Sequence, residues 1–393
     1  MKSNLMTIYE ELCFCAVFYR VTKKPLFKAF EGYCLAENTL QKRKAYTAFV
    51  AEIYEQGGNL SALVERLVSE DENTYVKRVA GKQEVDKNIQ NSVLRELAVL
   101  SKFASLTAKD FAEDMGVSVE ELSQFTSVNA DMVASYKNRI DNLHKYGYGI
   151  FSSVCMFRLS DDKKIEPIVS ADKISMAQFI GYEKEREKIV ANTRAFVEGR
   201  PAANALLCGD AGTGKSSTVK AVANAFFDEG VRLIELRKDQ LRYLPLVMAH
   251  ISGNPLKFII FIDDLSFNQN NDDFSMLKAA LEGSASATAD NAVIYATSNR
   301  RHIIKESFGD REGDDVHVND TLQETLSLSE RFGLTVLFSK PDKKLYLTIV
   351  RELAKRNGIT MDEKTLDLRA EEFALRKGSR SARCAEQFID SLL

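Results

Sequence analysis

One loop constrains this chain more than any other stretch of its sequence. Its residues, Gly209, Asp210, Ala211, Gly212, Thr213, Gly214, Lys215 and Ser216, fit the pattern G-x-x-x-x-G-K-[ST]. The short apolar run Ala205–Cys208 precedes the loop, and a helical pattern from Ser217 to Phe226 follows it. A buried strand, a tight loop and then a helix form the context in which this pattern binds phosphate groups.

The residue types in the loop explain what it can bind. Glycines allow the backbone to turn tightly and to direct its N–H groups inward, and the following helix adds the positive end of its dipole. We expect Lys215 to reach the terminal phosphates of a nucleotide and the Ser216 hydroxyl to ligate Mg2+, with Ser217 among the phosphate contacts. The alternative, a chance glycine-rich turn, does not explain why a strand and a helix flank the loop.

Composition and charge narrow the class of protein. The chain has 393 residues, which suggests two or three domains, and 45% of them are hydrophobic. The net charge of -3 argues against a nucleic-acid footprint over the whole chain, although a local basic patch would escape this count. The apolar run Leu12–Tyr19 is too short to cross a bilayer, and Glu10 and Glu11 argue against a signal peptide. Six cysteines without an export signal fit a reducing compartment, so we expect a cytoplasmic protein without membrane contact.

Residues 1–165 predict a mostly helical domain without a catalytic motif. Gly57-Gly58 is expected to divide one long helical pattern into two helices. The segment 107–122 has the spacing of a helix-turn-helix with two N-cap arrangements. Its second half is acidic, however, where a helix that reads DNA carries basic or amide side chains. We therefore expect this domain to contact a protein client, and a nucleic-acid partner is the less favoured alternative.

From residue 175 the pattern changes to strands that alternate with helices. Phe258–Ile262 is apolar throughout, as expected for a central parallel strand that is buried on both faces. The other predicted strands are Ala205–Cys208, Val231–Leu236, Ala292–Ala296 and Leu334–Phe338. This alternation predicts an α/β fold with a parallel, doubly wound sheet. The predicted domains are a helical domain over 1–165, an α/β core over 175–340 and a small helical domain over 341–393.

Two adjacent carboxylates, Asp263 and Asp264, follow the strand Phe258–Ile262 directly. Ligands of open α/β sheets bind beyond the carboxyl ends of the strands. We expect Asp263 to hold Mg2+ together with Ser216, and Asp264 to orient the attacking water in phosphoryl transfer. A helix cap or a turn is the alternative role for such aspartates, and the upstream phosphate loop favours the metal role.

Three further polar elements follow along the chain. Asn299, after the next strand, is expected to lie beside Asp264 and to help hold the water. Arg331 precedes the last strand and could enter the site of a neighbouring subunit, with a surface salt bridge as its alternative. Near the C-terminus, either Arg380 or Arg383 is expected to touch the γ-phosphate from the last helix.

These five elements, in this order, resemble those of the AAA+ ATPases, over residues 180–393. The sequence around four segments is also similar to an uncharacterised bacterial ATP-binding family known as domain of unknown function 815. The segments are Gly209–Thr218, Phe258–Phe267, Ile294–His302 and Leu326–Phe332. The resemblance implies a P-loop NTPase core with a five-stranded parallel sheet in the order 5-1-4-3-2, a helical lid, binding of ATP and Mg2+, and ATP hydrolysis. It implies no known substrate.

The chain departs from most AAA+ proteins at Asp264, where they carry a glutamate. Aspartate is one methylene shorter, so slow, switch-like hydrolysis is a real alternative. The sequence therefore predicts a Mg-dependent ATPase and homo-oligomer that acts as a remodelling machine or switch on an unknown client. Two alternatives stay open, a nucleic-acid loader suggested by the basic residues 300–302 and an ATP-sensing interaction protein with little turnover.

Overall fold

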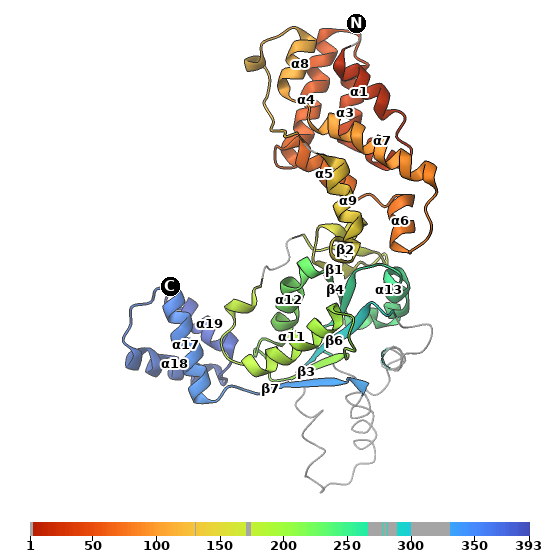
Figure 1. Cartoon of the computed structure of the whole chain (residues 1–393). Helices are drawn as coiled ribbons and strands as arrows, with labels where there is room; N and C mark the ends of the chain where they lie inside the picture. The colour runs from red at the N-terminus through yellow and green to blue at the C-terminus, as the bar shows by residue number, and fades with distance from the viewer. Residues whose placement is uncertain are drawn as a thin grey trace. The chain divides into compact units, whose positions relative to one another are not determined.

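The chain forms two compact units, Met1–Ser153 and Val154–Leu393. A computed structural model describes residues 3–129, 131–169, 174–265, 277, 281, 289–299 and 331–393 (Figure 1). The division falls before the expected residue 165, because the segment after Ser153 supplies two strands to the sheet of the second unit. Within the described ranges, no helix has both the length and the apolar character needed to cross a membrane.

The first unit consists of helices. They are α1 (Asn4–Leu12), α2 (Tyr19–Thr22), α3 (Pro25–Cys34), α4 (Thr39–Glu55), α5 (Leu60–Ser69), α6 (Thr74–Ala80), α7 (Lys87–Ala104), α8 (Ala108–Met115), α9 (Met132–Asp141) and α10 (Leu143–Tyr146). The side chains of Asn38, Asn59 and Asn73 accept hydrogen bonds from backbone N–H groups and fix the starts of α4, α5 and α6. Gly57 and Gly58, with φ angles of 96° and 80°, separate α4 from α5 as predicted.

Aromatic rings and one buried carboxylate hold the first unit together. Phe30, on α3, packs against Phe103 on α7 and Phe111 on α8, with ring centroids 4.9 Å and 6.2 Å away. Glu96, on α7, is 1% exposed, and its carboxylate accepts hydrogen bonds from three successive backbone N–H groups between α1 and α2. These charge-assisted bonds explain why a glutamate is stable inside this core.

The segment with helix-turn-helix spacing does not form two helices. α8 is followed by Gly116 with a φ of 64°, and then by a three-residue 3-10 turn, Val119–Glu121. Both predicted N-cap arrangements are present. A turn this short cannot lie in a groove of DNA as a recognition helix does.

The second unit is built around a sheet of seven strands. They are β1 (Met156–Leu159), β2 (Ile165–Pro167), β3 (Ala205–Gly209), β4 (Val231–Leu236), β5 (Lys257–Ile262), β6 (Ala292–Ser298) and β7 (Leu334–Phe338). The strand order is β2-β1-β4-β5-β6-β3-β7, and only the β1–β2 pair is antiparallel. The predicted α/β class with a mainly parallel sheet is confirmed.

The prediction of a five-stranded sheet in the order 5-1-4-3-2 is wrong for the sheet as a whole. The strands β7-β3-β6-β5-β4 do follow one another in that way, but β1 continues the sheet beyond β4 and β2 continues it beyond β1. β1 and β2 have only four and three residues, so they are too short for an alternating pattern to reveal. β1 is a strand because it pairs with β4, and β2 is a strand because it pairs with β1.

Helices cover the sheet and continue beyond it. α11 (Glu183–Val197) and α12 (Lys215–Ala225) contribute Ile189, Phe196 and Val219 to a core shared with Leu207 and Phe261 of the sheet. α13 (Leu244–Ile251) lies between β4 and β5 in the sequence. The C-terminal helices, α17 (Lys343–Arg356), α18 (Glu363–Lys377) and α19 (Ala382–Asp390), form a separate hydrophobic core of their own.

The register of the parallel strands brings the candidate site together. Cys208 of β3 is opposite Ser298 of β6, and Ile262 of β5 is opposite Ala296 of β6. The carboxyl ends of β3, β5 and β6 therefore lie at one edge of the sheet. The phosphate loop, the two aspartates and Asn299 all extend from this edge.

Candidate functional site

The phosphate loop begins where β3 meets the end of β7. Gly209 has a φ of 136°, and a Cβ atom at this position would lie 2.0 Å from the carbonyl oxygen of Phe338. The next residue, Asp210, donates its backbone N–H to the same oxygen at 3.2 Å. Only glycine permits this approach of two backbones. Gly212 and Gly214 also have positive φ angles, 75° and 86°, so the turn is built from three glycines.

Lys215 is the cation of the loop, and it is 5% exposed. Its Nζ atom donates hydrogen bonds to the carbonyl oxygens of Gly209 and Asp210, at 3.0 Å and 2.7 Å, and to Oδ1 of Asn299 at 2.9 Å. Burial lowers the pKa of the Lys215 amine, and the carboxylate of Asp210 is the first of several groups that oppose this shift. The ammonium group is thus held at the cavity wall by neutral acceptors.

The carboxylate of Asp263 joins three elements. Its Oδ1 atom accepts hydrogen bonds from the hydroxyls of Ser216 on α12 and Thr297 on β6, both at 2.6 Å. The backbone N–H of Asp264 donates to the same oxygen at 3.1 Å. A carboxylate beside a hydroxyl is the kind of oxygen donor set that Mg2+ accepts, usually together with water and phosphate oxygens.

Asp264 adopts a left-handed backbone conformation, with a φ of 52°. This conformation is uncommon for residues other than glycine, although aspartate adopts it more readily than most. The backbone N–H of Asp264 donates to Oγ1 of Thr297 at 2.9 Å, and its Oδ1 atom accepts a hydrogen bond from Nδ2 of Asn299 at 2.8 Å. Lys238 lies on the other side, with its Nζ atom 3.6 Å from Oδ2.

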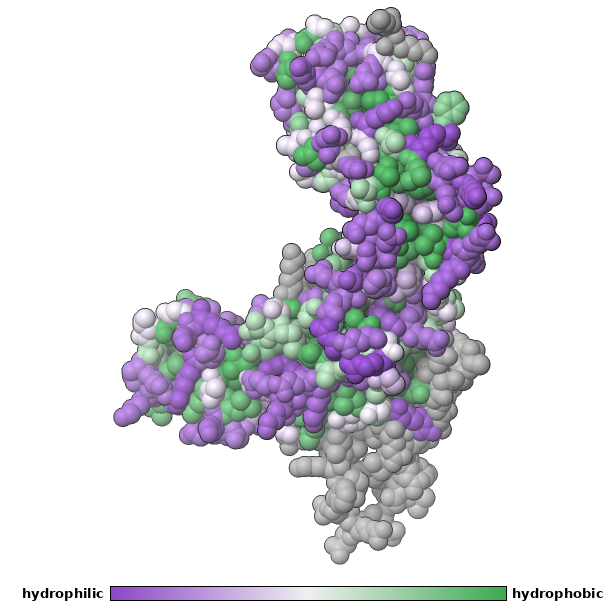
Figure 2. Space-filling model, in the orientation of Figure 1, coloured by the Kyte–Doolittle hydropathy of each residue, from purple (hydrophilic) through white to green (hydrophobic). Residues whose placement is uncertain are grey.

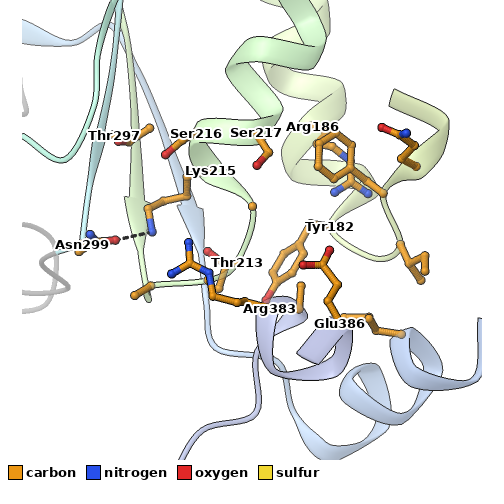
Figure 3. Close-up of a pocket in the computed structure, with 18 of the residues that line it drawn as sticks. Tyr182, Arg186, Thr213, Lys215, Ser216, Ser217, Thr297, Asn299, Arg383 and Glu386 are labelled. Carbon is orange, nitrogen blue, oxygen red and sulfur yellow. Dashed lines mark hydrogen bonds between the residues drawn. The ribbon is translucent and has the colours of Figure 1, made fainter. Parts of the chain in front are cut away.

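Asn299 therefore connects two groups that the sequence predicted separately. Its amide oxygen accepts from Lys215, and its amide nitrogen donates to Asp264. Figure 3 shows the first of these bonds, between the tip of Lys215 and Asn299. The expected proximity of Asn299 to Asp264 is what the structure shows, and the contact with Lys215 was not foreseen.

A cavity of about 350 Å³ lies against the phosphate loop. Its walls include the loop from Ala211 to Ser217, both aspartates, Thr297 and Asn299. Arg383, one of the two predicted arginines, also lines it. Sequence reasoning missed the rest of the lining, which comes from the segment before α11 and from the C-terminal helices. These residues are Gln178, Phe179, Ile180, Tyr182, Arg186, Ile349, Leu353, Ala382 and Glu386. A cavity that combines a polar end with apolar walls is typical of small-molecule sites.

The turn before α11 had a signal in the sequence, the pair Gly181-Tyr182. Gly181 has a φ of 75°, and a Cβ atom there would lie 2.6 Å from Cδ1 of Leu345 on α17. Tyr182 also has a positive φ, 59°, and its hydroxyl donates to the carbonyl oxygen of Ser339 at 2.6 Å. The buried guanidinium of Arg186 donates to the carbonyl of Gly181 and lies over the ring of Phe179. These contacts fix the turn against the cavity.

The structure distinguishes the two arginines near the C-terminus. Arg383 lines the cavity, and its backbone N–H donates to the carbonyl oxygen of Gly212 at 3.3 Å. In Figure 3 its side chain rises from α19 on the side of the cavity where Lys215 lies. Arg380 lies outside the cavity lining and binds Glu371 through two hydrogen bonds of 3.0 Å and 2.8 Å. The sequence alone did not separate these two positions.

Arg331 is not brought to the cavity of its own chain. It precedes β7, whose first residue, Leu334, is opposite Ala205 at the start of β3. The phosphate loop begins at the other end of this strand pair. Ala205 and Gly209, the two ends of β3, are about 13 Å apart, given the rise per residue of a parallel strand. The basic residues 300–302, on which the nucleic-acid alternative depended, lie outside the described residues.

The model of the family described as "Protein of unknown function (DUF815)" matches residues 152–393. The chain belongs to this family. The resemblance drawn from the sequence is confirmed, and the match covers the phosphate loop, both aspartates, Asn299 and the C-terminal helices. No curated protein matches the chain.

Solved structures of RuvB from Thermotoga maritima, described as a Holliday junction branch migration motor, are similar in part. The first shares 13% identity, with a TM-score of 0.34, over 56% of this chain and 72% of that chain. Two single-residue variants of the same protein share 14% and 15% identity, with TM-scores of 0.35 and 0.34. They cover 56% of this chain and 72% and 73% of theirs. These likenesses are too weak to carry an argument about function.

The close approach of Gly209 to β7 gives a prediction about stability. Gly209→Ala should lower the free energy of unfolding by about 2 kcal/mol or more, because the new methyl group must displace backbone atoms of Phe338. Gly199→Ala is the matched control, because Gly199 also has a positive φ, 71°, but open space around a Cβ atom. Urea unfolding of both variants checks this, and equal losses would show that the backbone conformation, not the clash, accounts for the effect.

Proposed function

We propose that this protein is a Mg-dependent ATPase of the AAA+ type that acts as a remodelling machine or switch on an unknown client. The observation that carries the proposal is the network through Asn299, which links Lys215 of the phosphate loop to Asp264. Beside it, Ser216 and Asp263 form a matched hydroxyl and carboxylate. Phosphoryl transfer needs groups that hold the phosphates, the metal and the water, and candidates for all three meet here.

Each residue has a proposed role in the reaction. The N–H groups of residues 209–217 and the Lys215 ammonium hold the phosphates, at the N-terminus of α12. Mg2+ would neutralise charge on the phosphate oxygens, and Ser216 with Asp263 would hold it. Asp264 is the group that accepts a proton from the attacking water, and Asn299 keeps its carboxylate in place.

Two arginines complete the proposed site. We assign the contact with the γ-phosphate to Arg383 rather than to Arg380, because Arg383 lines the cavity and Arg380 is bound to Glu371. Arg331 lies at the far end of β7 from its own loop, so it would act on a neighbouring copy in a homo-oligomer. Residues 341–393 would then work as a lid, and the helical unit Met1–Ser153 would work as the client-binding domain of a cytoplasmic protein.

A slower, ATP-sensing function is the second candidate. Asp264 is shorter than the glutamate of most AAA+ proteins, and its carboxylate is already engaged by Asn299 and Lys238. If the Asp264 carboxylate must first break its contacts with Asn299 and Lys238 before it can orient the attacking water, ATP hydrolysis is slower. The protein would then bind ATP tightly and hydrolyse it slowly, and its client would respond to the bound state.

The first test concerns nucleotide binding. Lys215→Ala should weaken ATP binding by about 10- to 100-fold, because charged hydrogen bonds to the phosphates are lost. Lys220→Ala is the matched control on α12, because Lys220 pairs with Glu235 at 3.2 Å and does not line the cavity. Isothermal titration calorimetry measures both affinities. Unchanged ATP affinity in a folded Lys215→Ala variant would remove the main proposal.

The second test separates binding from turnover. Asp264→Asn should bind ATP normally and lose hydrolysis by about 10²- to 10⁴-fold, because an amide cannot accept the proton of the water. Asparagine tolerates the φ of 52° at this position, so the fold should persist. Steady-state phosphate release measures the rate, with the exposed Asp228→Asn as control. Wild-type turnover in Asp264→Asn would contradict this role, and a very slow wild-type rate would favour the sensing function.

The third test addresses Arg331 and assembly. Arg331→Ala should bind ATP normally but hydrolyse it about 10³-fold more slowly, the effect expected for a missing arginine finger. A mixture with Lys215→Ala should recover activity, because mixed assemblies contain intact pockets that face intact arginines. Arg376→Ala, on the exposed side of α18, is the control. If subunits exchange and no activity returns, Arg331 does not act between copies.

A further inference from the structure

A carboxylate faces the cavity opposite the phosphate loop. Glu386 lies on α19, one turn after Arg383, and both side chains line the cavity. Figure 3 shows both side chains rising from this helix toward the cavity. Across the part of the chain that the structure describes, Glu386 has neither a hydrogen bond nor an ion pair. It is thus an acceptor without a partner in a candidate nucleotide site.

The surroundings of Glu386 indicate which part of a nucleotide it can face. The phosphate end of the cavity carries the cations Lys215 and Arg383, and a carboxylate would repel the phosphates there. The other cation in the lining, Arg186, is engaged by the carbonyl of Gly181. Glu386 is exposed to the cavity, yet enough protein surrounds its carboxyl group to raise the pKa; the charge of Asp390 raises it further, and the charge of Arg383 opposes the shift. A neutral ligand group that donates hydrogen bonds suits such a carboxylate.

The position of Glu386 along α19 selects between the donors of a nucleotide. The start of α19 is fixed to the phosphate loop, because the backbone N–H of Arg383 donates to the carbonyl oxygen of Gly212. Three residues further on, the helix has advanced only about 4.5 Å. The ribose follows the phosphates directly, whereas the amine of adenine lies at the far end of the base. Phe179, Ile180, Ile349 and Leu353 supply the apolar walls that suit the base.

We propose that Glu386 accepts hydrogen bonds from the ribose hydroxyl groups of the bound nucleotide, so that the C-terminal helices recognise the sugar. This inference rests on the nucleotide-binding function proposed above. Carboxylates bind ribose hydroxyls in this way in other nucleotide folds, where the acidic residue follows a strand of the sheet. Here the carboxylate comes from the same helix as the proposed γ-phosphate contact, Arg383. One helix would therefore contact both the sugar and the phosphates.

The inference predicts that the protein prefers ribonucleotides to deoxyribonucleotides. Wild-type protein should bind ATP about tenfold more tightly than at least one of two analogues, 2′-deoxy-ATP and 3′-deoxy-ATP. Tenfold is about the effect of losing one hydrogen bond to a charged group. In Glu386→Ala this preference should fall to about twofold or less, and Glu386→Gln should be intermediate, because its amide oxygen still accepts a neutral hydrogen bond. Fluorescence competition measures all affinities on the full chain.

Controls separate sugar recognition from other roles of Glu386. Glu372→Ala changes an exposed carboxylate on α18 that does not line the cavity, and it should keep the wild-type preference. Purine riboside triphosphate lacks the amine of adenine. If Glu386→Ala abolishes discrimination between this analogue and ATP, Glu386 faces the base and the inference is wrong.

The outcomes also separate this inference from the proposal beneath it. Wild-type protein that binds ATP and both deoxy analogues equally would overturn the sugar contact and leave nucleotide binding intact. A preference for ATP that survives in a folded Glu386→Ala variant would overturn it too. Protein that binds none of the nucleotides would remove the proposed function, and the sugar contact with it.

Discussion

The carboxylate of Asp263 is the interaction on which the candidate site depends. One of its oxygens accepts hydrogen bonds from Ser216 on α12, from Thr297 on β6 and from the backbone of its own neighbour Asp264. Asp263 is only half-buried, yet its carboxylate still loses part of its contact with water, and the three donors compensate for that loss where the strands end. A carboxylate has about four lone-pair sites, and within the described residues the hydrogen bonds of Asp263 all go to Oδ1. In the proposed function, the second oxygen is the one that would face a cation. Structure and chemistry can thus share one side chain.

The sequence was sufficient for the parts of the site that follow from local pattern. The phosphate loop, the paired aspartates and Asn299 stand after predicted strands, and parallel strands bring their carboxyl ends to one edge. Asn299 could be placed beside Asp264 for this reason alone. Its bond to Lys215 could not, because that contact depends on the direction of a long side chain, which no spacing specifies.

Long-range contacts explain what the sequence left out. β1 is a strand because it pairs with the edge of β4, and β2 is a strand because it pairs with β1; three or four residues carry no pattern of their own. The turn at Gly181 and Tyr182 and the position of Glu386 become part of a cavity only when α17 and α19 pack beside the loop. Likewise, Arg380 and Arg383 look equivalent in the sequence, and Glu371, nine residues before Arg380, separates them.

The contacts at the end of β7 tolerate side-chain mutations, because both acceptors are main-chain carbonyl oxygens. The carbonyl oxygen of Phe338 supports the first turn of the phosphate loop, and the next carbonyl, that of Ser339, accepts from Tyr182 before the chain enters α17. Every amino acid carries a main-chain carbonyl, so mutations at 338 or 339 change side chains without deleting either acceptor. Substitutions can alter these two contacts only at the residues that face the carbonyls, Gly209 and Tyr182. Drift in these two positions, rather than in β7, would mark relatives in which the contacts have been altered.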